Sequence, residues 1–290
     1  VEDTSCLPRL KLNDIDRKID KVEIEKDKNI ISIEQNTNGL FYTGFSIDLA
    51  GVQDKEQMLL PFMAYALTKA GTDKLSKSEL SKEIQKKSSG MSASVFAKTN
   101  LKNGFTLARL TLSAKSLPVN VSPLIQLCQE IIENHNFNTE KVISSLLNEY
   151  IARIEQSVVD QGHFYAMTMA ARNIDAGLNL SENWNGVSQL KYLRKIKKES
   201  IDLVEALRKL SSQVFASKPL FVLIGESEEL QTAKSVLSKE ENKISASIKA
   251  GVGKNTNLAI ATDTDVSFCA EAIKVVKIGH KDAAALLLLS

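Results

Sequence analysis

The sequence predicts an α+β domain in which helices pack on one antiparallel sheet. Strand-like runs occur in two pairs, each joined by a tight turn, and tight turns favour antiparallel neighbours. A long helical block with no strand inside it follows the second pair. The 290 residues are 43% hydrophobic and 25% charged, which is typical of a globular protein with a full core.

The first pair of strands opens the predicted domain. Ile30–Glu34 is a short apolar run, and Asn38-Gly39 after it is a hairpin signal. Residues 41–49 then alternate apolar side chains with small or polar ones, as a half-buried strand does. We therefore expect these two runs to form a hairpin.

Two helices are expected next. Residues 55–70 carry apolar side chains at helical spacing, and the pattern ends at Gly71. Ser76 and Glu79, three residues apart, are the signature of a capping box. A second helix is therefore predicted over Lys77–Lys87.

A second hairpin and the helical block complete the order of elements. Asn103-Gly104 marks the turn between strands predicted at 90–98 and 104–114. The remaining elements are helices at 121–134, 139–158, 161–175, 187–196 and 201–214, a strand at 219–224 and a helix at 228–237.

Composition divides the chain into four parts. Residues 1–29 are charged and irregular, as in a lead-in or linker, and residues 30–238 hold the complete α+β unit. Residues 239–258 are polar and rich in Gly, Ser, Lys and Asn, which is typical of a linker. Residues 259–290 resemble the truncated start of a further unit, whose last apolar run has no capping residue. This start is predicted as strands at 257–261 and 265–276 and a helix at 281–290.

Charge and cysteine content argue against several classes of protein. Lys plus Arg total 37 and Asp plus Glu 35, so the net charge of +2 favours neither a nucleic-acid nor a membrane partner. No apolar run approaches the ~20 residues of a transmembrane helix. The three cysteines lie far apart without a CxxC pair, which argues against a disulfide-rich secreted protein. They favour a reducing compartment such as a bacterial cytoplasm or an organelle matrix, and the sequence leaves open which.

Few residues suggest a chemical site. The three histidines form no pair at i, i+4, and neither HExxH nor HxxEH occurs, so no metal ligand and no catalytic residue is predicted in this chain. His163 and Arg172 flank an apolar helix with small side chains. The simpler interpretation is close helix packing, and the alternative is contact with a substrate chamber or another domain.

The segment ending in Gly71-Thr72 resembles a known metal motif. In pitrilysin/insulinase-type metallopeptidases the inverted zinc motif H-x-x-E-H is followed by an apolar turn and then Gly-Thr. The segment here lines up with that pattern without gaps. The three motif positions fall on Phe62, Tyr65 and Ala66, which offer no imidazole for a metal and no carboxylate for a water molecule. Glu149 falls near the helix that supplies the third zinc ligand in this family. A simpler interpretation is a solvent-exposed glutamate on the polar face of its helix.

Several other segments resemble the presequence protease/falcilysin branch of that family. They occur in the expected order and span nearly the whole chain. The segments are Cys6-Leu-Pro-Arg-Leu-Lys-Leu-Asn-Asp-Ile, Thr37-Asn-Gly-Leu, Leu67-Thr-Lys-Ala-Gly, Ser89-Gly-Met-Ser-Ala-Ser, Gly162-His-Phe-Tyr-Ala with Ala171-Arg, and Gly186-Val-Ser-Gln-Leu.

This resemblance implies a fold, an activity and partners. Enzymes of the family are built from tandem α+β repeats of the mitochondrial-processing-peptidase-like fold, and one repeat holds the metal. Their N-terminal half binds zinc and supplies the catalytic glutamate, and their C-terminal half, which this chain resembles, closes a chamber around an unfolded peptide. The implied protein is a zinc metalloendopeptidase that degrades unstructured peptides such as presequences. Its partners are the N-terminal catalytic half and the peptide, and this piece alone is expected to bind no zinc and to be inactive.

The missing ligands fit a second class of protein equally well. This class is a non-catalytic scaffold or peptide-binding subunit related to processing peptidases. An H-x-x-E-H motif upstream in a longer reading frame favours the enzyme, and its absence favours the scaffold.

Overall fold

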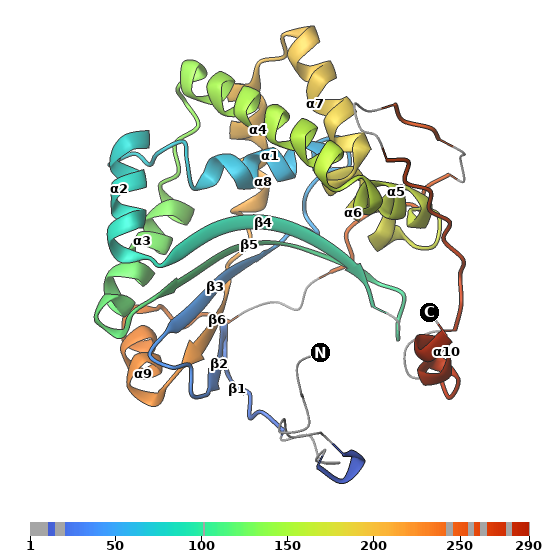
Figure 1. The fold of residues 1–290 in the computed structure, drawn as a ribbon. Coiled ribbons are helices and arrows are strands. Elements are labelled where there is room, and N and C mark those ends of the chain that lie inside the picture. Colours follow the sequence, from blue (N-terminus) through green and yellow to red (C-terminus); the bar gives the residue numbers. More distant parts are fainter. Residues whose placement is uncertain are drawn as a thin grey trace, which may run out of the picture.

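The computed structural model describes residues 11–14, 21–100, 102–241, 246–254, 258–261, 266–276 and 280–289. The predicted lead-in, the predicted linker and the predicted further unit therefore lie partly outside the described residues. Figure 1 shows a curved sheet with α1, α3, α4 and α8 over one of its faces.

The described strands form one sheet in the order β1-β2-β6-β3-β5-β4. The strands are β1 (Glu25–Asp27), β2 (Ile30–Glu34), β3 (Phe41–Asp48), β4 (Gly90–Thr99), β5 (Thr106–Ser116) and β6 (Leu220–Gly225). The helices are α1 (Leu60–Leu67), α2 (Lys77–Lys87), α3 (Val121–Glu133), α4 (Glu140–Asp160), α5 (Gly162–Ala171), α6 (Ala176–Asn185), α7 (Val187–Glu199), α8 (Leu203–Val214), α9 (Ser227–Val236) and α10 (Ala283–Leu289).

The α+β class is confirmed, but the sheet is mixed rather than wholly antiparallel. Strand β6 runs parallel to β2 and antiparallel to β3, and it lies between them. The predicted hairpin of β2 and β3 is therefore wrong. Asn38 and Gly39 do turn the chain, with φ of 54° and 74°, but the turn carries it across the position of β6. The second predicted hairpin, β4 with β5, is confirmed and pairs Gly90 with Lys115 through Thr99 with Thr106.

Local signals account for the helices that follow the first strands. In α2, the Ser76 Oγ accepts a hydrogen bond from the Glu79 backbone N–H, and the Glu79 carboxylate accepts one from the Ser76 N–H, so the predicted capping box is formed. Helix α1 is shorter than predicted because a 3-10 turn at Gln57–Leu59 precedes it and Pro61 lies in its first turn.

Two parts of the later chain differ from the prediction. Helix α6 was not expected, and the predicted helix at 161–175 ends at Ala171 as α5. The described residues 258–261 and 266–276 form no strand, since a strand-like pattern does not by itself supply the hydrogen-bond partners that a strand needs. Helix α10 lies within the predicted 281–290.

The core lies between the sheet and the helices. Phe41, Phe45 and Ile47 of β3 and Leu110 and Leu112 of β5 are fully buried on one face of the sheet. Burying each such side chain contributes roughly 1.5–3 kcal/mol. In the part of the chain that the structure describes, no helix combines the length and the apolar character that crossing a membrane requires.

Candidate functional site

The three motif positions lie where α1 packs against α4. Phe62 and Ala66 are fully buried, and Tyr65 is half-buried. The Tyr65 ring stacks on Tyr150 of α4 with 4.8 Å between centroids, and the Phe62 ring lies 5.9 Å from Tyr150. The Lys69 ammonium lies 5.0 Å from the centre of the Tyr65 ring. Aromatic packing therefore joins the two helices at this point.

Glu149 lies on α4 beside this stack and is bound to other residues. Its Oε1 lies 3.2 Å from the Lys77 Nζ and accepts a hydrogen bond of 3.1 Å from the Ser145 hydroxyl. Burial opposes ionisation of Glu149, but the hydrogen bonds from Lys77 and Ser145 and the charges of Lys77 and Lys69 outweigh it, so its pKa is lowered. The carboxylate is therefore ionised at neutral pH and paired with a lysine.

The residues at these positions do not fit a zinc ion. Zinc in proteins takes thiolate, imidazole and carboxylate ligands, usually three or four of them. The motif positions offer two aromatic rings and a methyl group, and burial followed by the charge of Glu149 raises the pKa of the Tyr65 hydroxyl. Over the described residues, His, Cys, Asp and Glu nowhere gather in a group of three or more that suits a metal.

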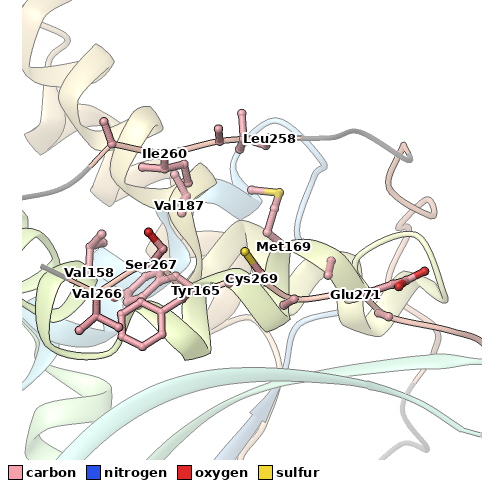
Figure 2. A pocket seen from close by; sticks show the side chains of 18 of the residues that line it. Val158, Tyr165, Met169, Val187, Leu258, Ile260, Val266, Ser267, Cys269 and Glu271 are labelled. Carbon is pink, nitrogen blue, oxygen red and sulfur yellow. The ribbon is translucent and has the colours of Figure 1, made fainter. Parts of the chain in front are cut away.

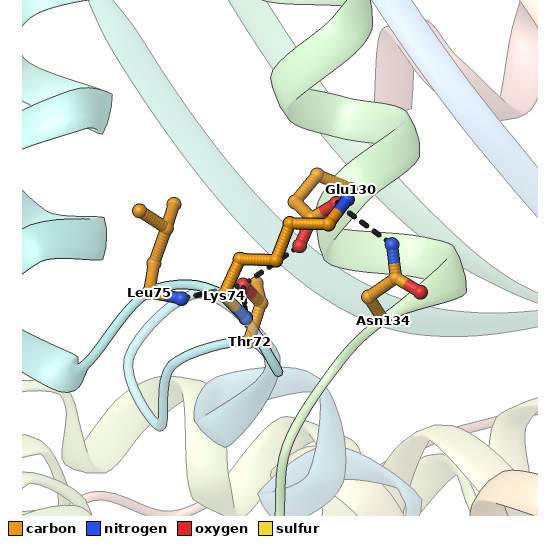
Figure 3. A network of polar contacts seen from close by, with 5 residues as sticks. All are labelled: Thr72, Lys74, Leu75, Glu130 and Asn134. Atoms are coloured by element: carbon orange, nitrogen blue, oxygen red, sulfur yellow. Dashed lines mark hydrogen bonds and ion pairs between the residues drawn. The ribbon is translucent and has the colours of Figure 1, made fainter.

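A polar network fixes the Gly-Thr end of the motif segment to α3 (Figure 3). The Thr72 hydroxyl donates to Glu130 Oε1 at 2.9 Å and accepts from the backbone N–H groups of Lys74 and Leu75. The other oxygen, Glu130 Oε2, accepts from Lys74 Nζ at 2.8 Å and from Asn134 Nδ2 at 2.7 Å. The turn after α1 is thus held by one carboxylate.

Replacing Glu130 by glutamine is expected to lower the free energy of unfolding at pH 7 by about 1–2 kcal/mol, since it removes a charged acceptor of three hydrogen bonds. Burial opposes ionisation of Glu130, yet the bonds from Lys74, Asn134 and Thr72 prevail and lower its pKa below the usual 4.5. A lowered folded-state pKa gives stability that is present above the unfolded pKa and is lost as the pH falls through the folded value.

Urea unfolding curves of both proteins between pH 3 and pH 7 test this expectation. The difference between wild type and Glu130→Gln should shrink below about pH 4.5. The matched control is Glu133→Gln on the exposed side of the same helix, which should change stability little at any pH. An unfolding difference that does not depend on pH contradicts the role given to the carboxylate.

Helix α5 contacts the chain segments that follow residue 245. The ring of His163 lies 5.9 Å, centroid to centroid, from Phe268, and Gly162 leaves the space that the Phe268 ring fills. Beyond the other end of α5, Arg172 Nε donates to the Lys254 carbonyl at 3.2 Å, and the Arg172 carbonyl accepts from the Gly253 N–H. Both residues singled out in the sequence thus contact the later segments, while a contact with substrate stays a prediction.

A cavity of about 780 Å³ lies between α5 and these segments. Figure 2 shows Tyr165 and Met169 of α5 among side chains of 258–261 and 266–272. Most of the residues that line it are of apolar types, with Lys254, Asn173 and Glu271 among the polar ones. The sequence did not predict this cavity, because part of its wall comes from segments that were predicted as strands.

Comparison with known proteins places the chain in a family. A family model described as peptidase M16-C associated matches residues 1–196, which is more than half of the chain. The chain belongs to the peptidase M16-C associated family. This match confirms the resemblance that the ordered segments indicate.

Several relatives of this M16-C associated chain are named presequence protease, mitochondrial. The protein from Danio rerio is 27% identical over 215 residues, which cover 72% of this chain and 21% of the relative. The protein from Saccharomyces cerevisiae is 25% identical over 312 residues, covering 100% of this chain and 31% of the relative. A relative from Clostridium perfringens named protein HypA is 26% identical over 303 residues, which cover 99% of this chain and 31% of the relative. The chain thus covers less than a third of the length of each of these relatives.

Solved structures share the fold of the M16-C associated chain. A peptidase M16 inactive domain from Pseudomonas fluorescens matches with a TM-score of 0.50 and 13% identity, covering 78% of this chain and 53% of that one. A conserved protein from Enterococcus faecalis V583 matches with a TM-score of 0.54 and 11% identity, covering 78% of this chain and 54% of that one. At this identity the matches establish the fold, and they confirm the metallopeptidase-repeat architecture that the sequence predicts.

Proposed function

We propose that this chain is a non-catalytic part of a longer zinc metalloendopeptidase that degrades unstructured peptides such as presequences. In this proposal the chain forms one wall of a chamber that encloses the peptide. The N-terminal catalytic half of the same protein is its partner and carries the zinc. Relatives named presequence protease, of which the matched residues cover only 21% to 31%, support this assignment.

The packing of α1 against α4 carries the proposal. The positions that hold His, Glu and His in a metal-binding repeat are Phe62, Tyr65 and Ala66 here, and their rings and methyl group form part of a packed core. Glu149, near the third-ligand position, is paired with Lys77. A helix pair in which packed side chains stand at the metal-ligand positions fits a repeat that has a structural role and no catalytic one.

In the intact enzyme, zinc would polarise the scissile carbonyl and activate a water molecule, with a glutamate as general base. None of these groups is assigned to this chain. The role proposed for it is enclosure, which admits short unfolded peptides and excludes folded proteins.

A peptidase assay on two proteins tests the proposal. The 290-residue chain with added zinc should not cleave a quenched fluorescent peptide above the buffer rate. The protein of the longer reading frame should cleave it and should lose this activity when a chelator is added. In that longer protein, Glu149→Gln should leave the zinc content unchanged, because Glu149 is not assigned as a ligand.

Two outcomes overturn parts of the proposal. Chelator-sensitive turnover by the 290-residue chain alone contradicts the non-catalytic assignment. A longer reading frame that lacks an upstream H-x-x-E-H and cleaves nothing supports the scaffold or peptide-binding subunit instead.

A further inference from the structure

A second cavity, of about 350 Å³, lies beside α1, the helix that carries the three motif positions. It is lined by residues of α1, α4, α5, α6 and α7 and by residues of strand β4. Tyr65 and Tyr150, the stacked pair described above, form part of its wall. The place where a metal-binding repeat would hold its ion thus borders a hollow in this chain. We call this hollow the α1 cavity.

Three buried polar atoms at the α1 cavity have no hydrogen-bond partner among the described residues. They are Trp184 Nε1 and the Nε2 and Oε1 atoms of Gln189. Both residues line the α1 cavity, and both are 0% exposed. Leaving a buried polar group unpaired costs about 1–3 kcal/mol. Three such atoms at one cavity therefore point to a ligand that supplies their partners once the side chains that now cover them move aside.

The chemistry of these atoms defines the ligand. The Gln189 carboxamide offers a donor and an acceptor side by side, and a peptide unit offers the complementary acceptor and donor. The indole N–H of Trp184 is a donor only and suits a further carbonyl oxygen. The rest of the lining includes the rings of Tyr65, Tyr150, Phe164 and Tyr165, which suit an apolar side chain.

Two features at the edge of the α1 cavity refine this assignment. Arg153 lines the cavity and is exposed, so its charge favours a carboxylate over an ammonium group next to the bound residue. Residues 93–95 of β4 line it as well, and among the described strands β4 is an edge of the sheet. The cavity therefore meets an edge strand of the described sheet.

We propose that the α1 cavity binds one apolar or aromatic residue of an extended peptide. The peptide unit of that residue pairs with Gln189 and Trp184, its side chain lies among the aromatic rings, and an acidic neighbour faces Arg153. This subsite deepens the proposed function, because it rests on peptides being the molecules that the chain helps to enclose.

Trp184 provides the measurement, since it is the one tryptophan of the chain. The capped tripeptide acetyl-Ala-Phe-Glu-amide is titrated into the 290-residue protein, and the midpoint is read from tryptophan fluorescence and checked by calorimetry. Gln189→Leu keeps the side-chain volume and removes both polar atoms, so it should keep the protein folded and weaken binding about 10-fold or more. The matched control, Gln126→Leu on the exposed side of α3, should leave the midpoint unchanged.

A second variant decides the matter if Gln189→Leu fails to fold. Arg153→Ala changes an exposed side chain, and it should abolish the preference for acetyl-Ala-Phe-Glu-amide over acetyl-Ala-Phe-Lys-amide. A wild-type protein that binds neither peptide, or that binds both with midpoints unaffected by either substitution, overturns the subsite. If the longer protein still cleaves peptides in that case, the proposed function stands. If the 290-residue protein binds the tripeptide but the longer protein has no peptidase activity, the proposed function alone is overturned.

Discussion

Replacing Gly71 by alanine is expected to lower the free energy of unfolding by about 2–4 kcal/mol. Gly71 has a φ of 114°, which L-residues rarely adopt. An added Cβ would also lie 2.7 Å from the Leu75 carbonyl oxygen and 3.2 Å from the Lys77 backbone nitrogen. Both neighbours are main-chain atoms and cannot rotate away, so the turn that carries Thr72 must shift.

Two glycine variants separate the sources of this cost. Gly104→Ala has a positive φ of 74° and nothing within 4 Å of the new Cβ, so it should cost only about 1 kcal/mol of backbone strain. Gly51→Ala has neither a positive φ nor a close neighbour and should be nearly neutral. Urea unfolding of the three variants measures the series. Equal losses for Gly71 and Gly104 would show that the clash with Leu75 contributes nothing.

Replacing Gly162 by alanine is expected to detach the segment around Phe268 from α5. The new Cβ would lie 2.4 Å from Phe268 Cδ2 and 2.7 Å from Cε2, so the ring must move. Alanine also favours the helix over glycine by roughly 0.5–1 kcal/mol, so global stability should change little. The expected result is the loss of the nuclear Overhauser contacts between the His163 and Phe268 rings, with the amide hydrogen exchange of α3 and β5 unchanged.

Gly251→Ala is the control for this measurement, because it lies in the same later part of the chain and an added Cβ meets nothing within 4 Å. It should leave the contacts between the His163 and Phe268 rings as in the wild type. A Gly162→Ala protein that keeps the contacts between the His163 and Phe268 rings would contradict the packing of Phe268 on this helix.

Sequence signals were sufficient where an element depends on its own residues. The capping box of Ser76 and Glu79 predicted Lys77–Lys87 to the residue. Helix α6 escaped because Gly177 and its asparagines and serine have low helix propensity. Its stability comes from the Asp175 cap and from burial of Leu180 and Trp184, which only the folded chain supplies.

The same local signals could not predict the pairing of strands that lie far apart in the sequence. Asn38-Gly39 indicates a turn correctly, yet the partner of β2 arrives as β6 from the far side of the helical block. The candidate site shows the same division. The motif alignment predicted that Phe62, Tyr65 and Ala66 lack metal ligands, whereas the meeting of Tyr65, Trp184 and Gln189 around one cavity follows from the packing of α1, α6 and α7.

The insertion of β6 between β2 and β3 has a consequence for biosynthesis. Until residues 220–225 have left the ribosome, the facing edges of β2 and β3 carry unpaired backbone groups and the sheet stays open. We expect the intervening helices to form earlier, since closing the sheet waits for a pairing between residues far apart in the sequence. We therefore expect the nascent chain to expose two unpaired strand edges while the residues between β3 and β6 are made, and to bind chaperones that shield such edges.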